Sequence, residues 1–418
     1  PVKMHYWRKM MTEMEFALNT FYLVLSGAFV MWMAAGFTML EAGLVRSKNV
    51  SEIVTKNLGL YSIACVMYLA CGFYLMYPGD DVINAYLPGM GTTWGISLSG
   101  LTANYDLGYS DAADFFFQVV FVATAMSIVS GAVAERMRLI PFFIFAVVMT
   151  GFIYPVQGYW KWGGGWLDAI GYTDFAGSGV VHLCGASAAL AAVLILGARS
   201  GKYGADGSVT VMRGSNIPIA ALGAFILWLG WFGFNGGSQL AVHTVDNANA
   251  VAQVFLNTNA AAAGGVLGAI IISKILTGKM DVTMGINGAI AGLVAITAAP
   301  DTPSGGLATI IGAIGGVIVY FSVVFFDSVL KVDDPVGAIS AHGTVGVWGI
   351  MATPLSGAGA FGTQAIGAVS IFLWTFITAG ATLLVIKAIM GLRPTLEDEM
   401  EGMDASEVGV SAYPEFSE

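Results

Sequence analysis

The sequence predicts an all-α integral membrane protein with eleven transmembrane helices, arranged as a five-plus-five inverted repeat with a peripheral eleventh helix. Three observations predict this fold. Of the 418 residues, 56% are hydrophobic and only 11% are charged, whereas soluble domains carry about 25% charged residues. Eleven apolar stretches are long enough to cross about 30 Å of hydrocarbon. Two of these stretches begin with the same Asp-x7-His spacing, one in each half of the chain.

The expected helices follow one another along the chain, and most of them are separated by short polar connections. In order, the expected spans are 15–37, 57–77, 115–134, 139–159, 175–198, 216–236, 250–274, 283–299, 305–326, 336–356 and 364–388. We divide the chain into a membrane domain, residues 1–390, and a polar, acidic tail, residues 391–418. An odd number of spans places the two termini on opposite sides of the membrane.

The inverted repeat is indicated by two segments, Asp174 to His182 and Asp334 to His342. They open the fifth and tenth expected spans, so each half contains five spans. Because five is odd, the halves have opposite orientation, and such repeats place the binding site near the midplane, at their interface. The two halves are about 15–198 and 216–356, and the extra helix is 364–388.

Lysine and arginine are unevenly divided between the two sets of loops, thirteen against four. The richer set lies on the side of the tail, which predicts a cytoplasmic C-terminus and an N-terminus outside the cell (inner) membrane. The poorer set is Lys3, Arg8, Lys9 and Lys161. The outer side is acidic instead, with Asp80, Asp81, Asp106, Asp111 and Asp114. Such a mouth raises the local cation concentration, although an ordinary solvated loop explains these residues equally well.

His182 and His342 are the strongest candidates for functional residues, because each lies in a long apolar stretch. An ionisable residue inside a membrane is costly and usually functional. Two neutral imidazoles that face each other can share a proton and pass on a small polar molecule. A haem held between the two histidines is an alternative, which a visible absorption spectrum tests.

The two aspartates of the repeated segments lie where helices are expected to begin. For Asp334 we favour an N-terminal cap, in which the carboxylate accepts hydrogen bonds from free backbone N–H groups. For Asp174 such a cap and a role in shaping an outer cation site are equally consistent with the sequence. The sequence indicates no metal site and no cofactor.

Five segments, in order, resemble the motifs of the Amt/Mep/Rh ammonium transporters, and of the Amt branch in particular. They are Ala35-Gly-Phe-Thr-Met-Leu-Glu-Ala-Gly-Leu-Val-Arg-Ser-Lys-Asn49, Gly131-Ala-Val-Ala-Glu-Arg136, Asp174-Phe-Ala-Gly177 with Val180-Val-His182, Gly230-Trp-Phe-Gly-Phe-Asn235, and Asp333-Asp-Pro335 with Ala341-His-Gly343. The resemblance runs from the first span to the tail. It implies a transporter rather than an enzyme, without a cofactor, that assembles as a homotrimer with one pore in each subunit.

The resemblance also implies an outer ammonium site formed by Phe121, Trp162 and Ser238. Phe121 and Phe234 would be the stacked rings of a gate, and Asp174 the buried carboxylate that supports the outer site. The chemistry is consistent with these roles. A cation over an aromatic face gains about 0.5–2 kcal/mol. A serine oxygen accepts a hydrogen bond from ammonium, whereas potassium has none to donate.

His182 and His342 would then line the pore and form its proton path. A charged ion in an apolar pore is expensive, so ammonia would pass as a neutral molecule while its proton is carried separately. Methylammonium is expected as a second substrate. Two alternatives are a passive, Rh-like ammonia channel and an ammonium receptor with little net transport. Trp162 and Ser238 argue against the passive channel, because both suit a cation.

Short segments depart from the family pattern. Ser178 stands where glycine is common, and Leu-Cys-Gly follows His182 where Ile-Asn is common. The tail reads Gly402-Met-Asp404 and Glu407-Val-Gly409, where the family often has Gly-Leu-Asp and a His-Gly pair. The tail departures weaken the expectation that a cytoplasmic P-II-type regulator docks there, and leave the pore expectations unchanged.

Overall fold

The computed structural model describes residues 2–94 and 108–416, with side chains described for residues 13–94 and 108–415. Asp106 and the side chains of Lys3, Arg8 and Lys9 lie outside these ranges. Helices dominate the described chain. The α-helices are α1 (Val2–Leu44), α2 (Val50–Met67), α3 (Phe73–Met76), α4 (Asp111–Ala132), α5 (Leu139–Val148), α6 (Tyr154–Lys161), α7 (Trp166–Ala169), α8 (Cys184–Leu196), α9 (Ile217–Gly237), α10 (Val245–Thr277), α11 (Val282–Ile296), α12 (Gly305–Val324), α13 (Val345–Ala352), α14 (Phe361–Met390) and α15 (Leu396–Glu401).

Short π-helical segments continue or link several of these helices. They are Tyr68–Gly72, Met149–Ile153, Ser178–Leu183, Phe325–Val329, Ile339–Thr344 and Asp404–Val408. Three 3₁₀ turns, Ser47–Asn49, Thr353–Ser356 and Pro414–Phe416, complete the helical structure. A small antiparallel hairpin pairs β1 (Val82–Asn84) with β2 (Leu87–Pro88). The indole N–H of Trp160 holds this hairpin to α6 by donating to the carbonyl of Tyr86 over 2.7 Å.

Nine helical runs of the described chain are long and apolar enough to cross a membrane, and each overlaps a predicted span. They are Glu13–Leu44, Ser47–Met76, Asp111–Ala132, Leu139–Ala169, Ser178–Leu196, Ile217–Gly237, Val245–Thr277, Gly305–Val329 and Phe361–Met390. The predicted spans 283–299 and 336–356 coincide with shorter helical segments. These are α11, which has 15 residues, and the run from Ile339 to Ala352, which changes from π to α at Val345.

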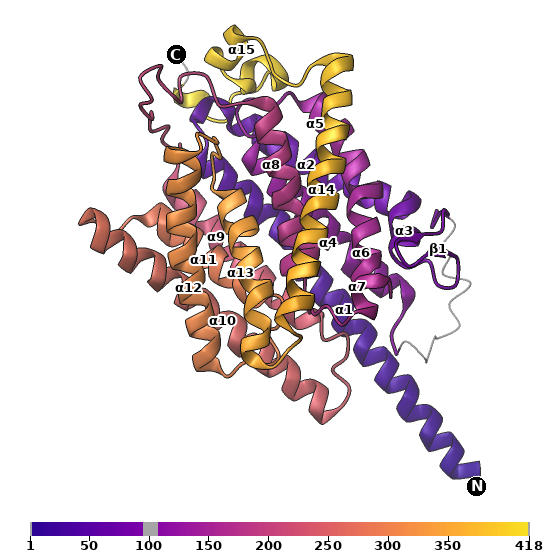
Figure 1. Ribbon diagram of the computed structural model, residues 1–418. Coiled ribbons are helices and arrows are strands. Elements are labelled where there is room, and N and C mark those ends of the chain that lie inside the picture. The colour runs from indigo at the N-terminus through magenta and orange to yellow at the C-terminus, as the bar shows by residue number, and fades with distance from the viewer. Residues whose placement is uncertain (1, 95–107, 417–418) are drawn as a thin grey trace.

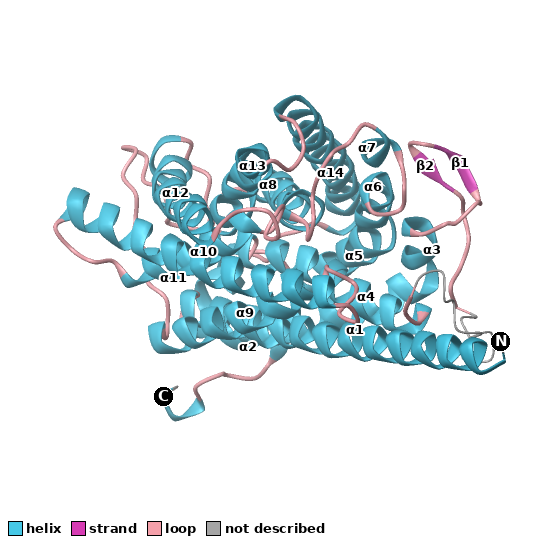
Figure 2. Ribbon diagram, turned by 90° about the horizontal axis from the view of Figure 1, so that it is seen from below, coloured by secondary structure: helices cyan, strands magenta, loops and turns pink. Residues whose placement is uncertain are grey.

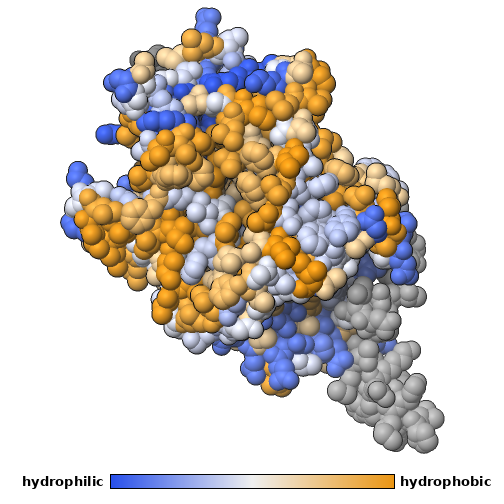
Figure 3. All heavy atoms as spheres, viewed as in Figure 1, coloured by the Kyte–Doolittle hydropathy of each residue, from blue (hydrophilic) through white to orange (hydrophobic). Residues whose placement is uncertain are grey.

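The long helices lie side by side between two ends of the molecule (Figures 1 and 2). The start of α1 lies at one end, and α15 with the C-terminal tail lies at the other. We call the end with the start of α1 the vestibule end, because a cavity opens there, and the other the tail end. Large apolar side chains such as Phe225 and Ile275 are exposed between them. In Figure 3 hydrophobic residues cover much of the middle of the visible face, and hydrophilic residues gather at the two ends. This pattern is that of a multi-pass membrane protein.

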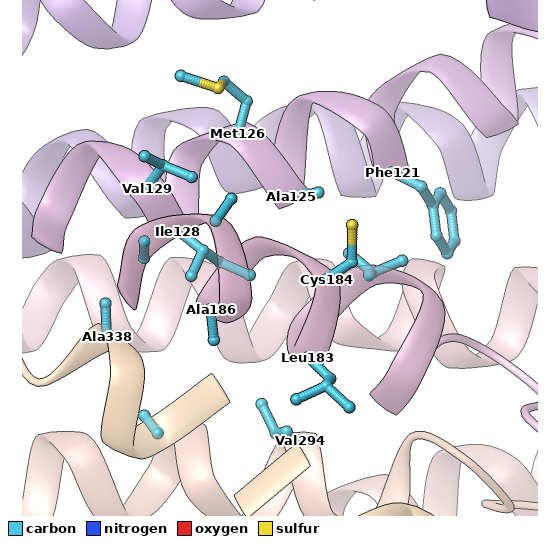
Figure 4. Packing of buried hydrophobic residues seen from close by; sticks show 14 of the residues in the cluster. Phe121, Ala125, Met126, Ile128, Val129, Leu183, Cys184, Ala186, Val294 and Ala338 are labelled. Atoms are coloured by element: carbon cyan, nitrogen blue, oxygen red, sulfur yellow. The ribbon is translucent and has the colours of Figure 1, made fainter. Parts of the chain in front are cut away.

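Small residues let the central helices α4 and α8 approach closely (Figure 4). A Cβ atom on Gly185 would lie 2.6 Å from the carbonyl oxygen of Ala125, so no larger side chain fits there. Apolar burial gives little between helices in lipid, so close van der Waals contact of this kind holds them together. The contact fixes α8, and with it the π-helical segment that precedes it.

The tail folds back onto the tail end of the helices. The amide N–H of Met403 donates to Asn49 Oδ1 over 2.9 Å, and the amide N–H of Glu52 donates to Asp404 Oδ1 over 2.8 Å. The amide N–H of Leu139 donates to Glu407 Oε2 over 2.9 Å. Tail residues that depart from the family pattern thus make contacts within the chain.

Candidate functional site

A cavity of about 630 Å³ opens at the vestibule end. The three residues expected to bind the cation, Phe121, Trp162 and Ser238, all line it. Asp111 and Asp114, from the acidic mouth, line it as well. The same cavity therefore combines aromatic faces, a hydroxyl and carboxylates, which is a chemistry suited to a small cation. We call this cavity the vestibule.

Two stacked phenyl rings adjoin the vestibule, and one of them lines it. Phe121 of α4 and Phe234 of α9 are stacked, with ring centroids 4.0 Å apart and an interplanar angle of 25°. Both rings are buried. Phe121 also meets Trp162 edge to face, with centroids 6.1 Å apart. Phe121 lines the vestibule and Phe234 contacts His182 beyond it, so the stacked pair separates the two.

Hydrogen bonds orient the polar groups of the vestibule. The Ser238 hydroxyl donates to the carbonyl of Phe234 over 2.8 Å, so its proton is engaged and its oxygen lone pairs remain as acceptors. The indole N–H of Trp162 donates to the carbonyl of Asp174 over 3.0 Å. The donor of this indole is therefore satisfied, and the ring stays available for a cation.

His182 and His342 face each other in the centre of the molecule. Their Nδ1 atoms are 3.2 Å apart, and the ring centroids are 5.1 Å apart at an angle of 27°. A hydrogen bond between two Nδ1 atoms needs one proton, so one ring donates while the other accepts. The separation is too short for a haem iron between two axial nitrogens. The Nε2 atom of His182 has no hydrogen-bond partner among the described residues.

His182 belongs to a continuous stack of rings. Its imidazole lies 5.4 Å from the ring of Phe234 and 5.0 Å from the indole of Trp231, both in stacked geometry. The Trp231 N–H is fixed by Thr297 Oγ1, which accepts from it over 2.9 Å. Phe121, Phe234, His182 and His342 therefore follow one another from the vestibule to the centre of the chain.

The two histidines lie on corresponding π-helical segments, Ser178–Leu183 and Ile339–Thr344. Asp174 precedes the first, and its Oδ2 accepts from the amides of Gly179 and Val180 over 2.9 and 2.8 Å. Asp334 precedes the second, and its Oδ2 accepts from the amide of Ile339 over 2.7 Å. Both carboxylates therefore accept from free amides at the start of a π-helical segment, the interaction expected for Asp334, although the residues at the N-cap positions are Gly177 and Ala338. The backbone carbonyl of Asp174 also accepts from the indole N–H of Trp162, whereas its expected role in an outer cation site stays a prediction.

Sequence reasoning assigned no role to three residues that lie along this path. Trp231 stacks on His182, and Gln118 lines the vestibule with an unpartnered Oε1. Glu41 lines a second, smaller cavity beside His342. Trp231 precedes Phe234 by three residues, a spacing that puts both on one helix face. That spacing was the available signal for Trp231. Gln118 and Glu41 become apparent only when the helices are assembled.

Charged residues support the second histidine segment at the tail end. The guanidinium of Arg199 binds Asp333 at 2.9 Å and Glu135 at 3.0 Å. The guanidinium of Arg136 donates to the carbonyl of Asp333 over 2.6 Å. Burial alone would raise the pKa of Asp333, but the hydrogen bonds and charge of Arg199, aided by Arg136, lower it to about 2. Among the described residues no cluster of His, Cys, Asp and Glu has the arrangement of a metal site.

Comparison with known proteins gives consistent relatives. Residues 21–413 match the sequence profile of the Ammonium Transporter Family. The chain is 39% identical to the ammonium transporter Amt2 of Archaeoglobus fulgidus, with 96% of this chain and 89% of the relative covered. It is 38% identical to the ammonium transporter Amt2 of Methanocaldococcus jannaschii, with 97% and 93% covered.

Solved structures show the same similarity in space. A structure described as a Sensor Amt Protein superposes with a TM-score of 0.87 and 34% identity, with 95% of this chain and 99% of that chain covered. Candida albicans Mep2 superposes with a TM-score of 0.81 and 26% identity, with 97% and 93% covered.

Proposed function

Because the chain belongs to the ammonium transporter family, we propose that it binds ammonium in the vestibule, removes a proton, and passes neutral ammonia along the histidine pair. The proton crosses separately. One observation carries this proposal: the rings of Phe121, Phe234, His182 and His342 form a continuous series that begins at the vestibule. No enzymatic reaction is part of it.

The first step is binding of the cation. Ammonium would rest against the faces of Phe121 and Trp162 and donate a hydrogen bond to Ser238 Oγ. The orientation of the serine hydroxyl supports this step, because its proton is directed to a backbone carbonyl and its lone pairs are free. Asp174 would support the site by holding Trp162 in place rather than by touching the cation.

The second step is passage through the pore. Phe121 and Phe234 would act as a gate, because their rings must separate to let a molecule reach His182. Beyond them the path is buried and mostly apolar, so a charged ion would be expensive there. The imidazoles offer a donor and an acceptor to neutral ammonia, and the hydrogen bond between their Nδ1 atoms links them for proton transfer.

The proposal extends to assembly and orientation. We place the protein in the cell membrane with eleven spans in a five-plus-five inverted repeat, the vestibule outside and the tail in the cytoplasm. We also propose a homotrimer with one pore in each subunit. An apolar groove of about 210 Å³ between α9, α10 and α11, lined by residues such as Phe225, Trp228 and Ile270, is the surface that we assign to contact between subunits. A P-II-type regulator would meet a tail already folded against the helices through Met403 and Asp404.

A second candidate function is ammonium sensing with little net transport. The high structural similarity to a protein called Sensor Amt Protein favours it. Both functions need the vestibule site, but only transport needs an open path through the gate. They are therefore separated by measuring conduction rather than binding.

The deciding experiment is a current recording on proteoliposomes that contain the full chain. An ammonium pulse should give a saturable inward current, and methylammonium a smaller one, whereas a potassium pulse should give none. Ammonium binding without current would favour the sensor. Potassium current equal to the ammonium current would overturn the proposed selectivity.

A further inference from the structure

A second cavity, of about 20 Å³, adjoins the histidine pair. His342 lines it and His182 does not. Most of the other lining residues are apolar, including Phe37, Ile128 and Leu227. A volume of 10–15 Å³ is about the minimum that holds one water molecule. The cavity is therefore large enough for one water in contact with His342.

Among the described residues, Glu41 is the only other titratable one that lines this cavity. Its side chain is 1% exposed, so the carboxylate is removed from bulk solvent. Oε2 accepts from Asn57 Nδ2 over 3.0 Å and from the Ser130 hydroxyl over 2.8 Å. Oε1 has no hydrogen-bond partner among the described residues. A buried carboxylate oxygen without a partner is costly, and such a group in a membrane span calls for a function.

The backbone keeps Oε1 open. Gly131 also lines the cavity, and a Cβ atom there would lie 3.5 Å from Oε1 of Glu41. The absence of a side chain at this position therefore leaves that oxygen uncovered. His342 presents the complementary atom: its Nδ1 is engaged by His182, which leaves Nε2 as the ring nitrogen free for a water in the cavity.

Resting on the proposed function, we propose that Glu41 is the proton acceptor on the tail side of the histidine pair and takes the proton of each ammonium from His342 through one water. When the Phe121–Phe234 gate opens, ammonium at the vestibule gives its proton to Nε2 of His182, and only neutral ammonia passes on. The Nδ1 proton of His182 moves to Nδ1 of His342. The Nε2–H bond of His342 breaks, the water accepts that proton as it gives one up, and an O–H bond forms on Glu41.

The charge balances, because one ammonium and one carboxylate become one ammonia and one carboxylic acid. Tautomer exchange in both rings restores the pair for the next cycle. Glu41 lies in the last turn of α1, which ends at Leu44, so its proton is released toward the tail end.

Other charged groups lie near this region but are already engaged. Lys56 Nζ pairs with Glu52 at 2.8 Å, and both side chains are fully buried in α2. The thirteen Lys and Arg residues counted in the loops on the tail side include Lys56, but this assignment is wrong, because Lys56 is buried within α2 and pairs with Glu52 one helical turn away. Neither residue lines the cavity beside His342.

The test compares Glu41→Gln with the wild-type chain in proteoliposomes. Glutamine keeps the shape, and its carbonyl oxygen can accept from Asn57 and Ser130, but it cannot take up a proton. We expect the ammonium current to fall at least about tenfold, because a positioned proton acceptor contributes about a hundredfold or more. Ammonium binding, followed by tryptophan fluorescence, should be unchanged. As a matched control, Ser130→Ala removes one donor to Glu41, keeps the carboxylate, and should keep the current.

The outcomes separate the two proposals. If Glu41→Gln carries wild-type current, Glu41 is not the acceptor, while the proposed function stands. If the wild-type chain carries no ammonium current, both fall. If the glutamine variant does not assemble, Glu41→Asp and Glu41→Asn give the same comparison, since they are equal in size and only aspartate takes up a proton. Aspartate should restore current and asparagine should not; equal currents would overturn the inference.

Discussion

The two histidine segments share one backbone design but have different neighbours. In both, an aspartate caps the start of a π-helical segment that carries a histidine eight residues later. The cap and the π turn explain the common Asp-x7-His spacing, because together they fix where the imidazole emerges. π turns are rare and often mark functional sites.

The surroundings differ at each end of the pair. The first segment is tied to the vestibule: Asp174 accepts from Gly177, Gly179 and Val180, and its carbonyl holds Trp162. The second is tied to the tail end, where Asp333, the residue before Asp334, is bound by two guanidinium groups. The comparison teaches that two similar segments supply the pair of imidazoles, whereas different neighbours connect one segment to the vestibule and the other to the tail end, as the proposed cation site and proton exit require.

The largest expected effect comes from removing what the two segments have in common. His182→Ala with His342→Ala takes away both proton carriers and leaves an apolar pore. A charge near the centre of a membrane span costs about 2.5–3.5 kcal/mol, so the proton-coupled ammonium current should fall roughly sixty- to three-hundredfold.

The measurement is the ammonium-pulse current on proteoliposomes. His243→Ala is the matched control, because His243 is hydrogen-bonded to Asn19 away from the pair. Unchanged current and unchanged selectivity over potassium in the double variant would show that the imidazoles are not the proton path.

The next prediction tests the difference between the two caps. Asp174→Asn weakens three charge-assisted hydrogen bonds to backbone amides, and bonds to charged groups are worth about 1.5–3 kcal/mol. Asp334 accepts from the amide of Ile339 and is also stabilised by that of Ala338, so Asp334→Asn, which replaces a charged acceptor by a neutral one at fewer amides, should cost less, about 1 kcal/mol. Thermal unfolding in detergent measures both. Equal losses would mean that the caps are equivalent and that the asymmetry lies elsewhere.

Much of the fold followed from the sequence, because the spans are marked by composition and the turns between them by polar residues. All nine helical runs that meet the length of a membrane span overlap a predicted one. The prediction failed where a residue's surroundings depend on how the helices pack together. Lys56 sits near a span boundary and was counted as a loop residue, but α2 begins at Val50 and buries it beside Glu52. A sequence pattern cannot reveal a partner that neutralises a charge inside the membrane.

Site residues could be predicted where the sequence around them carries a pattern, and could not where their role depends on residues distant in the sequence. The histidine pair follows from two equal spacings and is in contact as expected. Phe121, Trp162 and Ser238 came from the family resemblance alone, because nothing in their spacing distinguishes them. Glu41 lies within one of the family motifs, but the sequence assigned it no role. Its proposed role depends on the cavity that it shares with Gly131 and His342, which are distant in the sequence. Ser178, where glycine is common, is accommodated because its hydroxyl donates to the carbonyl of Val294 over 2.8 Å.

Acid should loosen the second segment through Asp333. The pKa of this carboxyl is lowered from 3.8 to about 2, mainly because Arg199 outweighs the effect of burial. A depressed pKa stabilises the fold above the ordinary value, and that stabilisation is lost as the pH falls from about 4 toward 2. The contribution is about 2 kcal/mol at 1.36 kcal/mol per unit. The melting temperature of the wild type should therefore fall further than that of Asp333→Asn across this window. Parallel curves would contradict the assignment.

The smallest effect concerns the vestibule side alone. Trp162→Leu keeps an apolar wall and removes the aromatic face that Asp174 positions. Losing one cation–π contact costs about 0.5–2 kcal/mol. The concentration of ammonium or methylammonium that half-saturates the current should therefore rise roughly two- to thirtyfold. Folding should be intact, because Trp162 lies at the wall of an open cavity. Permeation of uncharged ammonia should change little, since a neutral molecule gains nothing from the charge distribution of the ring.

Trp231→Leu sharpens this last comparison. Trp231 contacts His182 on the far side of the phenyl pair and does not line the vestibule. Its loss should lower the maximal ammonium current and leave half-saturation unchanged, the reverse of the expectation for Trp162→Leu. Half-saturation and maximal current, measured for both variants beside the wild type, decide the matter. If Trp162→Leu leaves half-saturation unchanged, Trp162 is only part of the vestibule wall, and the cation must bind to other groups there, of which Gln118 and Asp114 are the first to examine.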